Sequence, residues 1–327
     1  MNLLNEIIEK AKQKQGKIIL PEALKDARVM EAVKDVLNKK LSNLILFGKK
    51  SDYSKEISSN PMVEIIDIDN FAEKESLAEK LYELRKEKGM TLTEAKEKIN
   101  DELIFSNMLI KTNYATGMVA GAYYTTADVL RPALQIVKAK KGRKTISGSM
   151  LLIDNEQKAG RPSFMVFSDV SLVENPTTEQ LSEIAISAGE FVEKVIGVEP
   201  KIAFLSYSSK GSAKSEMTEK VVNATNLAKS NSSYLIDGEM QFDSAVDSAV
   251  AKKKKVDLTV GGQANVFIFP DLNAGNISYK IASRLGGYLA IGPITNNFAR
   301  PVNDLSRGCT AEEIVYTVAI TKLQAEI

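Results

Sequence analysis

The stretch KIILPEALKDARVMEAVKDVLNKKLSNLILFG, residues 17–48, contains the pattern from which the fold is predicted. Residues 17–22 and 43–48 are short runs rich in Ile and Leu, typical of buried strands, and residues 26–38 between them have helical periodicity. A strand, a helix and a second strand in this order form a unit whose two strands run parallel. The stretch therefore predicts an α/β fold.

The same alternation continues towards the C-terminus. Residues 91–112 are predicted to form one long helix, which begins at the capping-box pattern TLTE. Residues 145–153 and 163–170 are two successive strand-like runs, a hairpin-like pair that the first half lacks. The remaining strands are expected at 63–68, 117–121, 201–207, 234–237, 266–270 and 289–294, and the remaining helices at 71–87, 126–138, 177–196, 216–229, 277–285 and 311–325. This order favours two α/β domains with a cleft between them, joined near the sequence KKGRK that begins at Lys140.

Composition narrows the classes of function. The chain has 327 residues with 43 basic and 42 acidic side chains, a balance that gives no electrostatic footprint for nucleic acid or for an anionic membrane surface. No apolar run is long enough to span a bilayer, and the first residues are too charged for a secretory signal. The single cysteine, Cys309, cannot form an intrachain disulfide, so we expect a cytoplasmic protein.

The chain contains no histidine. Serine–histidine triads, histidine-ligated metal sites and histidine bases are therefore excluded. Any proton transfer must use a carboxylate, a lysine, a tyrosine or a group of the substrate. One thiol is too few for a structural zinc site, and no metal site is predicted.

Four segments place glycines and small polar residues beside predicted strand ends, where open α/β sheets bind ligands: 117–132, 206–215, 269–279 and 292–313. In the first, Thr125 and Thr126 stand at the start of a helix that also carries Asp128 and Arg131. Hydroxyls and free amides at a helix start can bind an anion, although an ordinary helix cap has the same pattern. The second has glycine, serine and lysine residues that could accept phosphates, but it is equally consistent with a flexible loop.

The last of these segments has the densest group of chemically active side chains. Asp304, Ser306, Arg307 and Glu313 fall within ten residues, next to the only cysteine. A hydroxyl, a guanidinium and carboxylates at this spacing suit the polarisation of an acyl phosphate, although a surface loop can have the same composition. Cys309 has no histidine to activate it, so a small buried residue is the better interpretation.

Seven stretches together resemble the short-form phosphate acetyltransferases, and the resemblance runs from Lys17 to the C-terminus. They are LPEALKDARV, LYELRKEKGMT, GAYYTTADVLRPALQIVKAKKG, SYSSKGSAKS, IDGEMQFDSA, GGQANVFIFPDLNAGNISYKIASRLGG and IGPITNNFARPVNDLSRGC. The resemblance implies a fold similar to isocitrate and isopropylmalate dehydrogenases, with a cleft between two α/β domains, and a homodimer. The last helix would return to the first domain, giving domains of 1–142 with 295–327 and of 143–294.

The resemblance also implies the reaction. Acetyl would pass reversibly between coenzyme A and phosphate in a ternary complex, with the thiolate of coenzyme A attacking acetyl phosphate directly. Acetyl-CoA, phosphate and acetyl phosphate would be substrates, with no bound cofactor and no acyl-enzyme. A phosphate butyryltransferase, or another transferase of short-chain acyl phosphates, is the nearest alternative.

Individual residues carry over from matching motifs. The resemblance implies that Arg28, Arg85 and Arg131 gather near the phosphate and coenzyme A sites. A guanidinium suits this role, because it can donate two hydrogen bonds to one phosphate and stays charged. Arg307 would hold the phosphoryl oxygens, and Ser306 would stabilise the transition state.

One position departs from the family pattern. The family usually has an aspartate, the suggested base for coenzyme A, where this chain has Glu313. The added methylene moves the carboxylate by about 1 Å, a displacement that matters in catalysis. Glu313 also completes a capping box with Thr310, and a helix start favours its ionised form, which makes it a weaker base. Asp304 is the alternative base.

Two other functions remain to be separated from the transferase. An oxidoreductase on the same type of fold would require carboxylates for a divalent metal and contacts for a nicotinamide, which no motif indicates. A non-catalytic sensor of coenzyme A or acyl phosphate is suggested by the glutamate at position 313.

Overall fold

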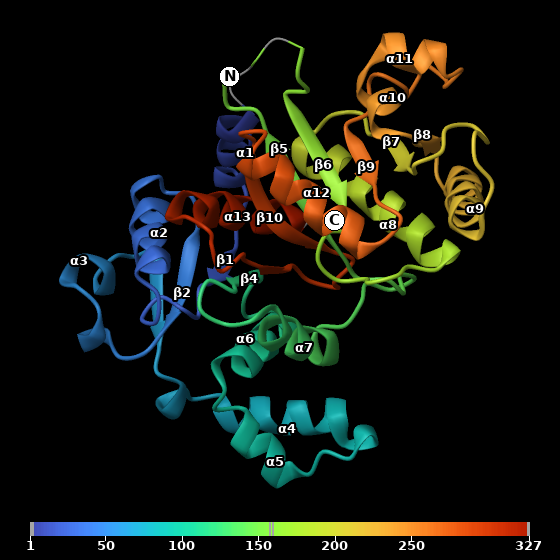
Figure 1. Cartoon of the computed structure of the whole chain (residues 1–327). Helices are drawn as coiled ribbons and strands as arrows, with labels where there is room; N and C mark the ends of the chain where they lie inside the picture. The colour runs from blue at the N-terminus through green and yellow to red at the C-terminus, as the bar shows by residue number, and fades with distance from the viewer. Residues whose placement is uncertain (1–2, 157, 159, 326–327) are drawn as a thin grey trace. The chain divides into compact units, whose positions relative to one another are not determined.

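The computed structural model describes residues 3–156, 158 and 160–325. The chain forms two compact units, Met1–Lys140 with Phe298–Ile327, and Lys141–Asn297 (Figure 1). The predicted domain boundaries lie within three residues of these limits. That each unit is a separate domain stays a prediction.

The first unit contains a sheet in which every pair of neighbouring strands is parallel. The order is β11 (Val302–Asp304), β4 (Gly117–Ala120), β1 (Lys17–Ile19), β2 (Asn43–Phe47) and β3 (Val63–Ile66). Ile18 lies opposite Leu44, so the parallel unit predicted from residues 17–48 is confirmed. The apolar side chains of β1 and β2 are buried, as the Ile- and Leu-rich runs require.

The helices of the first unit come from both ends of the chain. The last helix, α13, packs against α1 and α2 (Figure 1). Its side chains at 317–323 are buried on every face. The helices are α1 (Leu3–Lys12), α2 (Ala27–Asn38), α3 (Lys55–Ser58), α4 (Lys74–Arg85), α5 (Leu92–Lys98), α6 (Glu102–Lys111), α7 (Thr126–Ile136) and α13 (Ala311–Gln324), with short 3-10 turns at Lys50–Asp52, Ile68–Asn70 and Lys86–Lys88.

The prediction of one helix over residues 91–112 is wrong. The capping box at Thr91 is present, but α5 ends before Ile99, and α6 begins after Asp101. The Asp101 carboxylate accepts hydrogen bonds from the amides of Leu103 and Ile104, and Asn100 folds back to donate to carbonyl groups of α5. A side chain that satisfies the first amides of a helix starts a new helix there.

The second unit contains a mixed sheet. The order is β10 (Leu289–Asn296), β5 (Ser147–Ile153), β6 (Phe164–Ser168), β9 (Val266–Ile268), β7 (Lys201–Leu205) and β8 (Leu235–Met240). β5 pairs antiparallel with β6, so the predicted hairpin-like pair is confirmed. The helices are α8 (Thr178–Phe191), which continues as a π turn at Val192–Ile196, α9 (Glu216–Asn231), α10 (Phe242–Val246), α11 (Ser248–Lys253) and α12 (Leu272–Arg284). α9 packs beside β8 at the end of this sheet (Figure 1).

Four short elements and α1 were absent from the predicted helices and strands. β11, α3, α10 and α11 each span six residues or fewer, too short for a periodic pattern to distinguish them from loop. Within the described ranges, no helix combines the length and the apolar character that a segment crossing a bilayer needs.

Candidate active site

The candidate site forms where β1, β4 and β11 end side by side. Asp304 at the end of β11 lies opposite Ala120 at the end of β4, and β1 pairs with the other edge of β4. Because these strands are parallel, the loops that follow them leave the same edge of the sheet. Gly121, with φ +116°, brings the loop after β4 so close that an added Cβ would lie 2.4 Å from Asp304 Oδ1. This close approach requires glycine.

A buried carboxylate holds the loop after β4. Glu22, which follows β1, is 1% exposed and accepts hydrogen bonds from the amides of Gly121, Ala122, Tyr123 and Tyr124 at 2.8–3.2 Å. These are the amides that could have bound an anion at this strand end. The side chain of Glu22 occupies that position instead.

Arg28 ties the loop after β11 to the same edge. Its Nη1 donates to the carbonyls of Arg307 at 2.7 Å and Cys309 at 2.8 Å. Its Nη2 donates to Asp26 and to the carbonyl of Ala122, and its Nε donates to Asp26. A guanidinium has five N–H donors, and all five are used here. Arg28 therefore positions the Ser306–Arg307 turn, and in this conformation it has no donor left for a phosphate.

Asp304 is a buried carboxyl group that accepts one side-chain hydrogen bond. It is 2% exposed, and its Oδ2 accepts a hydrogen bond from Thr126 Oγ1 at 2.6 Å. Among the described residues, Oδ1 has no hydrogen-bond partner. Burial raises the pKa of Asp304 to about 7, and the charge of Glu22 raises it too. The Thr126 hydrogen bond, the Leu305 amide and the charge of Arg307 oppose the rise. A carboxyl with this pKa can accept and return a proton near neutral pH.

Ser306 and Arg307 lie on the exposed turn that follows Asp304. Ser306 Oγ accepts a hydrogen bond from the amide of Gly308, which leaves its own proton available to a ligand. Cys309 ends the turn as a buried residue, as predicted. Burial raises the pKa of its thiol to about 11, so a thiolate is disfavoured there.

Glu313 forms the capping box that the sequence predicts. Its carboxylate accepts a hydrogen bond from the Thr310 amide at 3.0 Å, while its own amide donates to Thr310 Oγ1. Its charge also acts on the thiol of Cys309, which places it in the same cluster. One of its two oxygens is therefore occupied in starting α13.

Three other predicted residues have different environments. Thr125 caps α7, and its hydroxyl donates to Asp128 at 2.7 Å. Arg131 is exposed on α7, with its charge acting on Asp128. Arg85 ends α4 with a buried Nε that has no hydrogen-bond partner in the described part of the chain. No hydrogen bond joins Arg85 or Arg131 to the cluster in the described part of the chain.

The glycine-containing loop at 206–215 belongs to the second unit. Here too, a buried carboxylate accepts hydrogen bonds from the donors of the loop. Glu239 is 3% exposed and accepts hydrogen bonds from the Gly211 amide at 2.7 Å and from Ser208 Oγ at 2.9 Å. Lys210 Nζ donates to Asp237 at 2.6 Å. These three donors of the loop are thus engaged within the protein, whereas Lys214 of the same loop is exposed.

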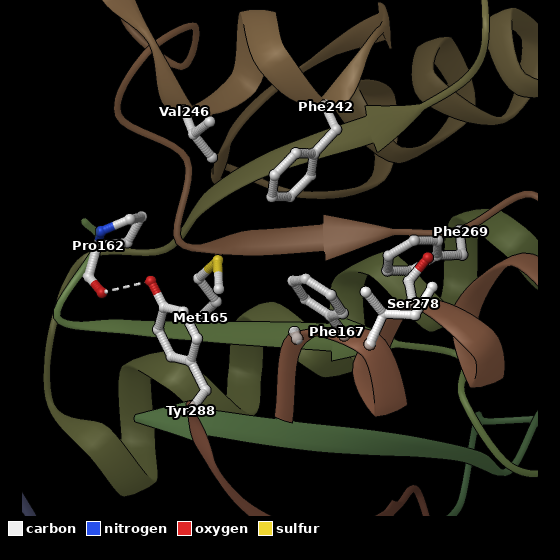
Figure 2. Close-up of a pocket in the computed structure, with 10 residues that line it drawn as sticks. Pro162, Met165, Phe167, Phe242, Val246, Phe269, Ser278 and Tyr288 are labelled. Atoms are coloured by element: carbon white, nitrogen blue, oxygen red, sulfur yellow. Dashed lines mark hydrogen bonds between the residues drawn. The ribbon is translucent and has the colours of Figure 1, made fainter. Parts of the chain in front are cut away.

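The second unit also has an apolar pocket with a volume of about 360 Å³ (Figure 2). Aromatic and aliphatic side chains line it, and the Tyr288 hydroxyl donates to the carbonyl of Pro162 at its margin (Figure 2). None of the residues predicted for catalysis or substrate binding lines this pocket, but Phe269 and Ser278 of the predicted segment 269–279 do. In the described residues, no group of three or more His, Cys, Asp or Glu side chains could hold a metal ion.

Sequence reasoning missed Glu22, Asp26 and Gly121. Glu22 and Asp26 lie in the LPEALKDARV stretch, but a local pattern does not tell a buried carboxylate from an exposed one. Gly121 follows directly after a predicted strand, which was the available signal for a close backbone approach.

A parallel sheet with a buried carboxyl, a hydroxyl and a guanidinium at its carboxyl edge defines an α/β enzyme suited to group transfer at an acyl phosphate. The model of the phosphate acetyl/butaryl transferase family matches residues 2–322, and the chain belongs to this family. The resemblance seen in the sequence is thereby confirmed.

Individual relatives agree with this assignment. The chain is 48% identical to a phosphate acetyltransferase of Acetivibrio thermocellus, an alignment that covers 100% of this chain and 99% of the relative. It is similar in structure to a phosphotransacetylase from Streptococcus pyogenes, with a TM-score of 0.91, 39% identity and coverage of 99% and 98%. A branched-chain phosphotransacylase from Enterococcus faecalis shares the fold at a TM-score of 0.70 and 17% identity, with coverage of 95% and 99%.

Proposed function

We infer that this chain is a phosphate acetyltransferase, which moves acetyl reversibly between coenzyme A and inorganic phosphate. Coenzyme A and acetyl-CoA are then substrates, not bound cofactors. The family membership supports this activity. The observation that carries the site is the turn of Ser306 and Arg307, which Arg28 holds beside the buried carboxyl of Asp304.

The proposed reaction is a direct displacement. The thiolate of coenzyme A attacks the carbonyl carbon of acetyl phosphate, a C–S bond forms, and the C–O bond to phosphate breaks. Arg307 holds the phosphoryl oxygens, and Ser306 Oγ donates to the carbonyl oxygen as negative charge develops there. The buried thiol of Cys309 takes no part, because its raised pKa keeps it protonated.

The predicted arginines divide into two roles. Arg28 acts as a positioning residue, since its donors are used on the backbone of the turn. Arg85 and Arg131 are proposed to bind phosphate groups of coenzyme A or of acetyl phosphate. Thr125 shapes the start of α7, and the two candidate bases are Glu313 and Asp304.

The activity is tested by incubating the full chain with coenzyme A and acetyl phosphate and following thioester absorbance. Turnover is expected, and its absence in correctly folded protein would contradict the proposal. Phosphate butyryltransferase activity is tested in parallel with butyryl phosphate. A higher kcat/KM for butyryl phosphate would move the chain to the alternative. An NAD(P)H assay with hydroxy acids tests the oxidoreductase, and tight ligand binding without exchange would indicate a sensor.

Arg307→Ala tests the site. We expect kcat/KM to fall by at least ~100-fold, because an electrostatic contact to the transition state is lost. Thermal unfolding should change little, since the Arg307 side chain is on an exposed turn. Arg300→Ala is the control, because Arg300 is a half-buried arginine that precedes β11 and donates only to Asn113 among the described residues. Near-normal exchange in Arg307→Ala would refute the assignment.

A cleft between two domains as in isocitrate dehydrogenase, a homodimer and a cytoplasmic location remain predictions. They derive from the resemblance and from composition. Sedimentation of the purified chain tests the homodimer.

A further inference from the structure

The reaction needs a base for the thiol of coenzyme A, and the cluster contains one carboxyl that is not committed to structure. Glu22 accepts four backbone amides, Asp26 binds Arg28, and Glu313 caps α13. Asp304 accepts a single side-chain hydrogen bond, and its other oxygen is buried and has no hydrogen bond of ordinary geometry in the described part of the chain, although the Leu305 amide acts on the carboxyl group. An incompletely satisfied buried group of this kind is costly to keep.

Asp304 does not reach the surface itself. It is 2% exposed and lies between β4 and α7 at the end of β11. The group that contacts it from the solvent side is the hydroxyl of Thr126, the first residue of α7 and an exposed one. A hydroxyl can donate its proton to one partner while its lone pairs accept a proton from another.

We propose that Thr126 and Asp304 form a two-residue proton relay, in which Thr126 Oγ1 contacts the thiol of coenzyme A and Asp304 Oδ2 stores the proton. This inference rests on the proposed function and names the base of the same site.

The step balances in both directions. As the S–H bond breaks, its proton passes to Thr126 Oγ1, and the proton already on Thr126 passes to Asp304 Oδ2 over the 2.6 Å contact. The products are a thiolate, an unchanged threonine and a neutral Asp304. After phosphate leaves the acetyl group, the same path returns the proton to a phosphate oxygen. Asp304 is then ionised again for the next turnover.

Charges around Asp304 favour this cycle. Glu22 faces it from the loop after β1, and Arg307 faces it from the loop after β11. α7 contacts Asp304 through the neutral hydroxyl of Thr126, and β4 has no charged residue. α13 contacts β11 through hydrogen bonds between neutral side chains and Asn303. Burial and the charge of Glu22 outweigh the charge of Arg307 and raise the pKa of Asp304 to about 7. The carboxyl therefore changes its charge within the working range of a base.

The test is the pH dependence of kcat/KM for acetyl-CoA formation by the full chain and its variants. Wild type should lose activity as the pH falls below about 7, because Asp304 becomes protonated. Thr126→Ser keeps the hydroxyl and should stay within about threefold of wild type. Thr126→Val and Asp304→Asn should each lower kcat by at least ~100-fold, with smaller changes in KM. The fall in activity at acidic pH, which is the acidic limb of the wild-type profile, should be absent in both variants. The double variant should be no slower than the slower single variant, because the two residues act as a unit.

Thr112→Val is the matched control for deletion of a threonine hydroxyl. Its hydroxyl donates to carbonyl groups within α6, so this variant should keep the wild-type profile. Thermal unfolding of each variant separates loss of folding from loss of catalysis. If Thr126→Val stays within threefold of wild type and keeps the acidic limb, the relay is overturned while the transferase activity stands. If wild type shows no exchange at all, the proposed function itself fails.

Discussion

At the scale of single residues, the site is determined by which polar groups are already occupied. Arg28 is a motif arginine whose donors are all used on the protein, whereas Arg307 presents its backbone carbonyl to Arg28 and its side chain to solvent. The residue type is the same in both cases. The difference arises from Asp26 and from the turn carbonyls around Arg28.

Asp304→Asn is predicted to have a stability effect that depends on pH. The folded pKa of about 7 lies above the ordinary value of 3.8, so the folded state binds the proton more tightly than the unfolded state. Wild type therefore loses stability relative to Asp304→Asn as the pH rises from about 4 to about 7, by an amount on the order of a few kcal/mol. Urea unfolding at several pH values measures this difference.

Asp128→Asn is the control with the opposite sign. Thr125 holds the pKa of the exposed Asp128 below its usual value, so the contribution of that carboxylate is present above the unfolded pKa and is lost on acidification. A stability difference for Asp304→Asn that does not change between pH 4 and 7 would contradict the burial argument.

At the scale of elements, buried carboxylates organise the loops that leave the strands. Glu22 accepts hydrogen bonds from amides of the loop after β4. Glu239 accepts hydrogen bonds from the loop after β7. Asp169 accepts hydrogen bonds from four amides, those of Gly148, Ser171, Leu172 and Val173. Each of the three is less than 5% exposed. Such donors compensate part of the cost of burying a carboxyl group and stiffen the backbone that it binds, although burial still raises the pKa of Asp169. These loops are thus shaped by side chains of the protein itself.

Gly121→Ala is predicted to destabilise the fold. An added methyl group would meet Asp304 Oδ1 at 2.4 Å and the Leu305 amide nitrogen at 2.6 Å, at a φ of +116°. Strain and overpacking together should cost about 2–4 kcal/mol in denaturant unfolding. Gly89→Ala is the matched control, because Gly89 also has a positive φ of +87° but no atom within 4 Å of an added Cβ.

The control substitution should cost only about 1 kcal/mol. Equal losses of stability in the two variants would show that backbone conformation, and not the contact with Asp304, determines the requirement for glycine at position 121.

At the scale of the whole molecule, every residue predicted for the site lies in the first unit. They come from four stretches of the chain, and the first unit itself combines residues 1–140 with residues 298–327. The return of the chain to this unit brings β11 next to β4 and places its last residue at the edge where Glu22 and Thr126 already lie.

Chelation is predicted to leave the activity of the whole chain unchanged. The chain has no histidine and one cysteine, and its candidate phosphate ligands are arginines. Arginine can neutralise phosphate without a cation. Turnover should therefore persist after treatment with EDTA and buffer exchange. A loss of turnover that one divalent cation restores would contradict this prediction.

The local sequence pattern was sufficient to predict most helices and strands and the capping boxes at Thr91 and Thr310. Their hydrogen bonds and apolar periodicity involve neighbours a few residues apart. Matches to known motifs were sufficient to identify the family. Only the tertiary structure decided that Thr126 contacts Asp304 from 178 positions away, and that Arg28 binds the backbone of Arg307 from 279 positions away. Burial, and with it the raised pKa of Asp304, depends on such distant neighbours, because the local sequence carries no information about which groups exclude water from a side chain.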